Sequence, residues 1–242
     1  MCQIGSKNIT KVLLFVAMSV AGHASIISTT GVTVLSTPPA SVQLNQLQSN
    51  TDVYAFQEQS NLDLSLPLLV DVTNPGTYDS LADIPLLPGH IAAGTTINSY
   101  YLTADPDLSL LTLDFVLFSG RSITFSPGET VIGIQFLEPS LLLGALEVGA
   151  SGTAYPPLPV GYGLELTNLL IDPANDSFSL SADRSTVSLD LITGGGLDTG
   201  GVDQIRIITS VAPVPEPGTW LLMLSGACLI LFGARGRQQK SC

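Results

Sequence analysis

The middle of the chain consists of short apolar-rich runs that Gly and Pro interrupt about every ten residues, the spacing typical of antiparallel strands and turns. Apolar and polar residues alternate within several runs, for example in Thr186–Leu191. Gln204–Ile207 follows the same rule, so we expect its two isoleucines to face the core and Gln204 and Arg206 to face solvent. The pattern predicts an all-β unit, either an antiparallel β-sandwich or a jelly roll.

One stretch departs from this alternation. The apolar run Val131–Leu137 reads as a buried strand that ends before Pro139, and Ser140–Glu147 is then rich in Leu. We predict one or two helical turns over Ser140–Glu147. Ser140 is the predicted N-cap, because its side-chain oxygen can accept a bond from a free N–H of the first turn.

Residues 1–24 have the three parts of a secretory leader. Lys7 and Lys11 precede an apolar run, and Gly22-His23-Ala24 places small residues next to a cleavage site. The apolar run has about ten residues, whereas a helix that spans a bilayer needs roughly 20. We therefore predict cleavage after Ala24; the alternatives are an uncleaved anchor or a buried helix.

A proline-rich motif follows the middle of the chain. Pro215 and Pro217 flank Glu216. Because proline fixes φ and lacks an N–H donor, this stretch cannot join a helix or a sheet and is predicted to be extended. An extended peptide of this kind is suited to the active site of a processing enzyme.

The motif introduces a membrane-directed tail at residues 214–242. An apolar run begins after Trp220 and is near the short limit for a spanning helix. Arg235 and Arg237 follow it, and basic residues favour the cytoplasmic side. We predict a single C-terminal transmembrane helix, with residues 25–213 outside the cell membrane and the basic tip inside.

Together, Pro215-Glu216-Pro217, the apolar run and the Arg pair resemble the PEP-CTERM sorting domain. The resemblance implies recognition by exosortase, a membrane-embedded enzyme similar to cysteine proteases, with cleavage near the motif. It also implies a Gram-negative host that makes exopolysaccharide. The exported protein would be anchored transiently in the inner membrane and would end at the outer cell surface or outside the cell. The alternative is a plain single-pass tail anchor that is never processed.

The charge of residues 25–213 limits the classes of partner. This stretch holds nineteen acidic residues and only three basic ones, Arg121, Arg184 and Arg206, which gives a formal charge of −16. Nucleic acids and anionic membrane surfaces repel a protein of that charge. None of the three cysteines falls in this stretch, so a disulfide framework is excluded there.

Two pairs of aspartates are the candidate ligand residues of the chain. Asp105 and Asp107 form one pair, and Asp172 and Asp176 form the other. Both pairs are typical of turns that Asp side chains cap. The alternative is Ca²⁺, which takes carboxylate and carbonyl oxygens from loops. His90 is the only histidine of residues 25–213, and a lone histidine cannot build a zinc site. No other cofactor and no catalytic residue is predicted.

Three functions fit this sequence. The first is a non-enzymatic surface or matrix protein associated with biofilm or exopolysaccharide. The second is a carbohydrate-binding module that stacks aromatic residues on sugar rings, with or without calcium. The third is a secreted polysaccharide hydrolase. The tyrosines available for stacking are equally typical of core or cross-strand positions; they are Tyr100, Tyr101, Tyr155 and Tyr162.

Overall fold

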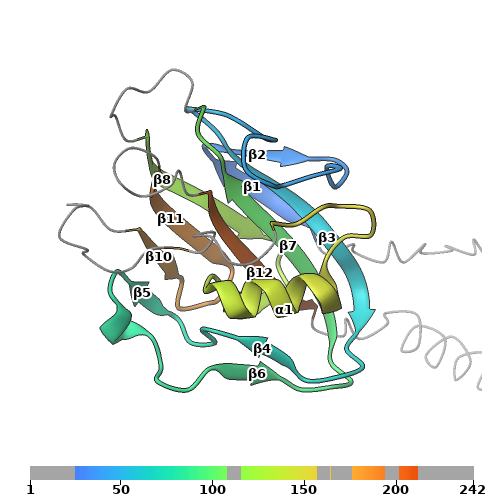
Figure 1. Cartoon of the computed structure of the whole chain (residues 1–242). Helices are drawn as coiled ribbons and strands as arrows, with labels where there is room; N and C mark the ends of the chain where they lie inside the picture. Colours follow the sequence, from blue (N-terminus) through green and yellow to red (C-terminus); the bar gives the residue numbers. More distant parts are fainter. Residues whose placement is uncertain (1–24, 108–115, 157–163, 165–175, 194–201, 212–242) are drawn as a thin grey trace, which may run out of the picture. The chain divides into compact units, whose positions relative to one another are not determined.

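The computed structural model describes residues 25–107, 116–156, 164, 176–193 and 202–211. Ala24–Pro213 form one compact unit. The regular structure of the described residues consists mainly of two five-stranded sheets, one two-stranded sheet and one α-helix, which confirms the all-β prediction (Figure 1). Among the described residues, no helix has the length and apolar character needed to cross a membrane. The predicted spanning helix belongs to residues 214–242, which lie outside the described part of the chain.

The first sheet contains, in spatial order, β1 (Ile26–Thr30), β8 (Val116–Phe125), β11 (Thr186–Thr193), β10 (Ser177–Leu180) and β5 (Gly76–Tyr78). The second contains β2 (Val32–Leu35), β3 (Val53–Asp63), β7 (Thr96–Ala104), β12 (Asp203–Val211) and β9 (Glu129–Gln135). The small sheet pairs β4 (Leu68–Val70) with β6 (Gly89–Ile91), and a 3₁₀ turn, η1, covers Leu81–Asp83. All these pairs are antiparallel except β2 with β3, which are parallel.

The main hydrophobic core contains inward-facing residues of both five-stranded sheets. Phe118 of β8 and Leu189 of β11 belong to it, as do Leu102 of β7 and Ile205 and Ile207 of β12. The two isoleucines therefore face the core, as their alternation with polar residues predicted. Each inward side chain of this size contributes about 1.5–3 kcal/mol when its apolar surface leaves water.

The other face of the second sheet is also covered, and this differs from the sequence prediction. Gln204 and Arg206 were expected to face solvent, but their exposed fractions are 1% and 0%. The helix α1 (Glu138–Val148) and the β4–β6 pair lie against this face (Figure 1). A second and a third cluster of buried apolar residues fill the space beneath them. The polar positions of β12 are therefore interior positions.

The start of α1 corrects the predicted cap. The helix begins at Glu138 and its N-cap is Leu137, which forms no side-chain cap bond. Ser140 instead donates its hydroxyl to Asp71 Oδ2 at 2.5 Å. The same carboxylate oxygen accepts the backbone N–H groups of Phe136 at 2.7 Å and Leu137 at 2.9 Å. An acid distant in the sequence thus takes the role of the local cap, because it satisfies N–H groups that the helix start leaves free.

Candidate functional site

The predicted sorting residues lie outside the described part of the chain. These are Ala24 at the leader cleavage site, the motif Pro215, Glu216 and Pro217, and the basic residues Arg235 and Arg237. Their roles stay predictions drawn from the sequence. The described residues belong to the folded unit between these segments, and the polar side chains of that unit are described next.

Asp105, one of the four candidate calcium ligands, holds a neighbouring loop. Its Oδ1 accepts the N–H of Asn45 at 3.2 Å, and its Oδ2 accepts those of Gln46 at 2.9 Å and Leu47 at 3.1 Å. Burial raises the pKa of this carboxyl, and the three backbone donors oppose the rise. Both oxygens thus bind backbone N–H groups of the loop Asn45–Leu47, about 60 positions away, and not of the local turn at Asp105–Asp107 that the sequence predicted.

The other candidate ligands are placed as follows. The N–H of Asp107 donates to Asn50 Oδ1 at 2.8 Å, and Asp176 Oδ1 accepts the N–H of Ile192 at 2.8 Å. Asp172 lies outside the described residues. Within the described ranges, no three side chains of His, Cys, Asp or Glu gather as a metal site would require. Calcium binding stays a prediction. The lone His90 is exposed on β6 and pairs with Leu69 across the small sheet.

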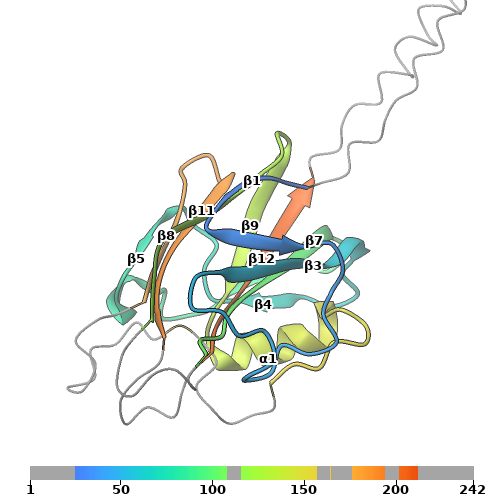
Figure 2. The same ribbon diagram turned by 90° about the horizontal axis from the view of Figure 1, so that it is seen from above.

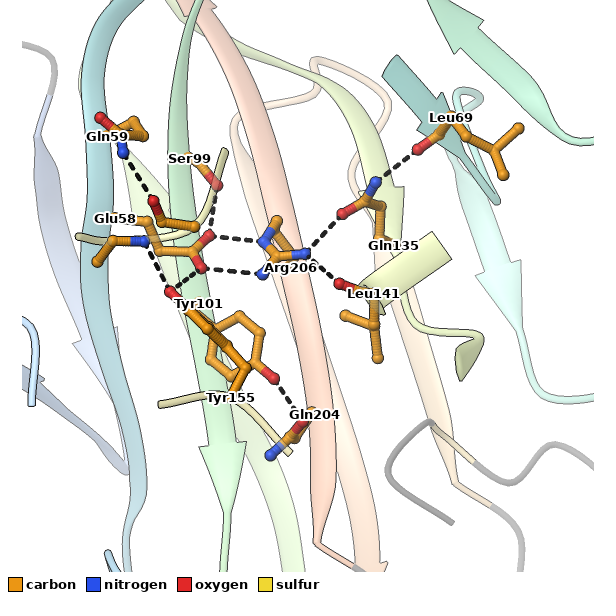
Figure 3. A network of polar contacts seen from close by, with 12 residues as sticks. Glu58, Gln59, Leu69, Ser99, Tyr101, Gln135, Leu141, Tyr155, Gln204 and Arg206 are labelled. Atoms are coloured by element: carbon orange, nitrogen blue, oxygen red, sulfur yellow. Dashed lines mark hydrogen bonds and ion pairs between the residues drawn. The ribbon is translucent and has the colours of Figure 1, made fainter. Parts of the chain in front are cut away.

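The most concentrated polar chemistry of the described residues is a buried ion pair that the sequence analysis missed. Glu58 of β3 and Arg206 of β12 form two parallel hydrogen bonds (Figure 3). The Nε of Arg206 lies 2.6 Å from Oε2 of Glu58, and Nη2 lies 2.9 Å from Oε1. Both side chains are fully shielded from solvent. This two-bond geometry is the strongest that arginine makes with a carboxylate.

Neighbouring groups complete the hydrogen bonding of the pair. Nη1 of Arg206 donates to Gln135 Oε1 and to the carbonyl of Leu141, both at 2.9 Å. Ser99 donates its hydroxyl to Glu58 Oε2, and Tyr155 donates to Glu58 Oε1, both at 2.5 Å. Burial disfavours the charge of Arg206, but the carboxylate of Glu58 more than offsets this and raises the guanidinium pKa. The guanidinium therefore stays charged inside the protein.

Two tyrosine rings lie close to the guanidinium. Its central carbon lies 4.9 Å from the ring centre of Tyr101 and 5.6 Å from that of Tyr155, within the range of cation–π attraction. The hydroxyl of Tyr101 donates to Gln204 Oε1. Burial is the main cause that raises the pKa of Tyr101 well above its usual value. Burial is also the main cause that raises the pKa of Tyr155, so both phenols are neutral donors. Tyr101, which is 2% exposed, cannot stack on a sugar ring.

Gly144 of α1 explains how closely the helix approaches this cluster. A Cβ at this position would lie 2.1 Å from Gln135 Oε1 and 2.4 Å from Arg206 Nη1. Only a residue without a side chain lets the helix backbone reach the two groups. The Leu141 carbonyl, one turn earlier, then accepts from Arg206. The ion pair therefore fastens α1 to the second sheet.

A second buried carboxylate holds the end of β12. Glu129 Oε1 accepts from Asn98 Nδ2 at 3.1 Å and from Tyr100 OH at 3.0 Å. The Thr209 hydroxyl donates to the same oxygen. Burial and the nearby carboxylate raise the pKa of Tyr100, which keeps it a donor. These contacts tie β7, β9 and β12 together just before the described chain ends.

The polar groups of the Glu58–Arg206 pair are all used inside the fold. Each of the three nitrogens of the Arg206 guanidinium has an acceptor, and both oxygens of Glu58 have donors. Neither group is open to solvent. The sequence signal was faint: an arginine between two isoleucines, in a unit with few basic residues. Its partner is 148 positions away, and no local pattern identifies it.

Comparison with known families concerns the other end of the chain. The family model of the PEP-CTERM protein-sorting motif matches residues 213–238. The match contains the Pro-Glu-Pro motif and both predicted basic residues, Arg235 and Arg237. Neither a curated protein nor a solved structure matches the chain.

Proposed function

Because the chain carries a PEP-CTERM sorting motif at residues 213–238, we propose that it is a non-enzymatic protein of the outer cell surface or extracellular matrix. The motif marks it as an exported substrate of exosortase. In this proposal, the leader at residues 1–24 directs export and the apolar tail anchors the chain transiently in the inner membrane. Exosortase then cuts near Pro215–Pro217 and releases the folded unit.

The folded unit supports a structural role for its conspicuous polar residues. Glu58 and Arg206 bind each other, Asp71 binds the start of α1, and Asp105 binds a backbone turn. Charged groups that are held in this way are not free to act on a substrate. Because these groups stabilise the fold, we favour a non-enzymatic role for the unit.

The surface charge favours a hydrated extracellular environment. The surplus of acidic residues in residues 25–213 keeps the unit soluble and separate from anionic membranes. We place the mature protein in the biofilm or exopolysaccharide layer on this ground and on the family resemblance. We class its two-layer fold as an antiparallel β-sandwich.

The experiment that tests the sorting proposal changes the motif alone. Pro215→Ala combined with Glu216→Ala is expected to block processing and leave a larger, membrane-retained species in a host with exosortase. Pro88→Ala combined with Glu147→Ala is the matched control, because both residues are exposed on the folded unit. Equal gel mobility of the motif variant and the parent would overturn the proposal.

A carbohydrate-binding module, with or without calcium, is the alternative, and a secreted polysaccharide hydrolase is the third candidate. Tyr100 and Tyr101 are 2% exposed, and Tyr155 is engaged with Glu58, so these rings are not a platform for sugar stacking. A glycan array probed with the mature protein, with and without EDTA, separates the candidates. Binding would favour the module, and turnover of a polysaccharide panel would favour the hydrolase.

A further inference from the structure

The folded unit begins and ends at the same place. The N–H of Ser126 donates to the carbonyl of Ser25 at 3.0 Å, next to the start of β1. Val211, the last residue of β12, pairs with Glu129. The N–H of Glu129 in turn donates to the carbonyl of Ser126 at 2.9 Å, which closes the turn. Figure 2 shows the start of β1 and the end of β12 on the same side of the unit.

We call this region the exit end and define it as Ser25, Ser126–Gly128 and Val211. The side chains of Ser25, Ser126 and Pro127 are uncharged, although the unit as a whole is strongly acidic. Pro127 and Gly128 are exposed. A partner that contacts only these three side chains does not have to desolvate a charge.

The opposite end of the second sheet lies far from the exit end. β12 runs from Asp203 to Val211, and Asp203 pairs with Ala104 at the end of β7. At about 3.4 Å per residue, Asp203 and Val211 are about 27 Å apart. Gln46, whose N–H binds Asp105, lies at that far end and is exposed. It offers a matched control position.

The chain between the exit end and the sorting motif is short. Pro215 comes four positions after Val211. Even when fully extended, four residues span at most about 14 Å. An enzyme that holds the Pro-Glu-Pro segment in its active site therefore has only that distance between the bound segment and the folded unit.

The end of β12 is held firmly, so this distance cannot easily grow. Thr209 donates to the buried carboxylate of Glu129, and Ser210 and Val211 pair with Thr130 and Glu129 of β9. Releasing these residues would break strand pairing and leave a buried carboxylate short of a donor, which is costly inside a protein. Fraying of β12 is thus an unfavourable way to lengthen the tether.

From the shared exit and the short, fixed tether, we infer that the processing enzyme docks against the exit end while it cuts at the motif. This rests on the proposed function, since it requires exosortase to act near Pro215–Pro217. It adds that the enzyme has to fit against a folded surface while it binds a linear motif. The shape of Ser126–Gly128 then affects the rate of processing.

The test compares two exposed positions in the full chain, expressed in a host with exosortase and followed by pulse-chase. Pro127→Trp adds bulk at the exit end, and Gln46→Trp adds the same bulk at the far end. Pro127→Trp is expected to slow conversion about tenfold, because the added ring keeps the enzyme from fitting against the exit end while it holds the motif; a tenfold change corresponds to about 1.4 kcal/mol. Gln46→Trp is expected to be processed at the rate of the parent.

An insertion separates a lost contact from a misfolded unit. About eight Gly and Ser residues placed after Ala212 lengthen the tether by up to about 28 Å. The insertion is expected to restore the rate of Pro127→Trp, because the enzyme then no longer has to meet the exit end. Equal rates for Pro127→Trp and the parent would overturn the inference, and so would a slow rate that the insertion does not restore.

The motif variant run in parallel keeps the two proposals apart. If Pro215→Ala with Glu216→Ala is processed like the parent, the proposed function itself fails. If the motif variant is blocked while Pro127→Trp and the parent are processed equally, only the docking inference fails.

Discussion

Glu58 and Arg206 lie 148 positions apart in the chain and form a fully buried ion pair with two hydrogen bonds. The pair joins β3 to β12, and Arg206 also binds the Leu141 carbonyl of α1. Taking two charges out of water is costly, so such a pair is retained only where neighbouring groups satisfy both partners. Here it specifies how α1 sits on the second sheet.

Replacing one partner of this pair should lower the free energy of unfolding more than replacing both partners does. Arg206→Met leaves the carboxylate of Glu58 buried without a cation, and we expect a loss of about 3–5 kcal/mol in the free energy of unfolding. Glu58→Gln should cost a similar amount for the reverse reason. The double variant should lose clearly less than the sum of the two, because the single losses share one cause.

Urea denaturation of residues 25–213 measures these differences. Arg121→Met is the matched control, since Arg121 is half-buried and donates to the carbonyl of Thr51. We expect it to cost less than about 1 kcal/mol, as for most surface changes. Strictly additive losses in the double variant would show that the two residues act independently.

Gly144→Ala should destabilise the protein although alanine favours helices. In a helix open to solvent the change would gain about 1 kcal/mol. Here the added Cβ would lie 2.1 Å from Gln135 Oε1, so the helix has to move away from the ion pair. We expect a net loss of about 1–3 kcal/mol, typical of overpacking.

Thermal unfolding checks this expectation. Leu143→Ala, on the same helix and 47% exposed, is the comparison that changes the helix without crowding the cluster. A higher midpoint for Gly144→Ala than for the parent would contradict the close approach of α1.

Tyr155→Phe should loosen the segment that follows α1. The Tyr155 hydroxyl donates to Glu58 Oε1 and accepts the N–H of Ala150 at 2.8 Å. Without it both groups are left short of a partner, which costs about 1–3 kcal/mol. Amide hydrogen exchange at Ala150 should become faster, while Tyr54→Phe, at a half-buried position on β3, should leave it unchanged. Unchanged protection of Ala150 in Tyr155→Phe would refute the contact.

Asp71 should give the stability a dependence on pH. Burial raises its pKa above the ordinary value of 3.8, against the opposing effect of its Leu137, Ser140 and Phe136 donors. The folded state then binds the proton more tightly than the unfolded state does. Its contribution to stability therefore falls as pH rises from about 4 through the raised pKa, and it is constant above that pKa.

Asp71→Asn keeps an acceptor oxygen but removes this titration, so its stability should decline less between about pH 4 and pH 7 than that of the parent. Asp183 supplies the control. Hydrogen bonds from Ser181 and Ser185 lower the pKa of Asp183. Its contribution to the stability of the fold is therefore lost only when the pH falls below the ordinary carboxyl pKa of 3.8. The stability of Asp183→Asn should therefore decline between these two pH values as much as that of the parent does. Identical slopes for Asp71→Asn and the parent would remove Asp71 as the cause.

Local sequence patterns were sufficient to predict part of this fold. Period two placed β11 and the inward isoleucines of β12, because a strand exposes alternate residues to each face regardless of the rest of the chain. The same rule failed for Arg206, since period two says which residues share a face but not what covers that face. Its cover is α1, which is far away in the sequence.

The prediction of Ser140 as the N-cap of α1 was wrong for a related reason. Ser140 has the right chemistry for a cap, but Asp71 provides a stronger acceptor from across the fold. The sorting motif could be predicted because its chemistry is linear: proline rigidity, an apolar run and a basic tip need no tertiary partner. The family match at residues 213–238 confirms it.

Mass spectrometry of the two termini of the native secreted protein tests the whole account most directly. We predict a mature chain that begins at Ser25 and ends near Pro215–Pro217, without the apolar run and without Arg235 or Arg237. A chain found in the cytosol with Met1 and Cys242 both intact would contradict export through the leader and processing at the motif.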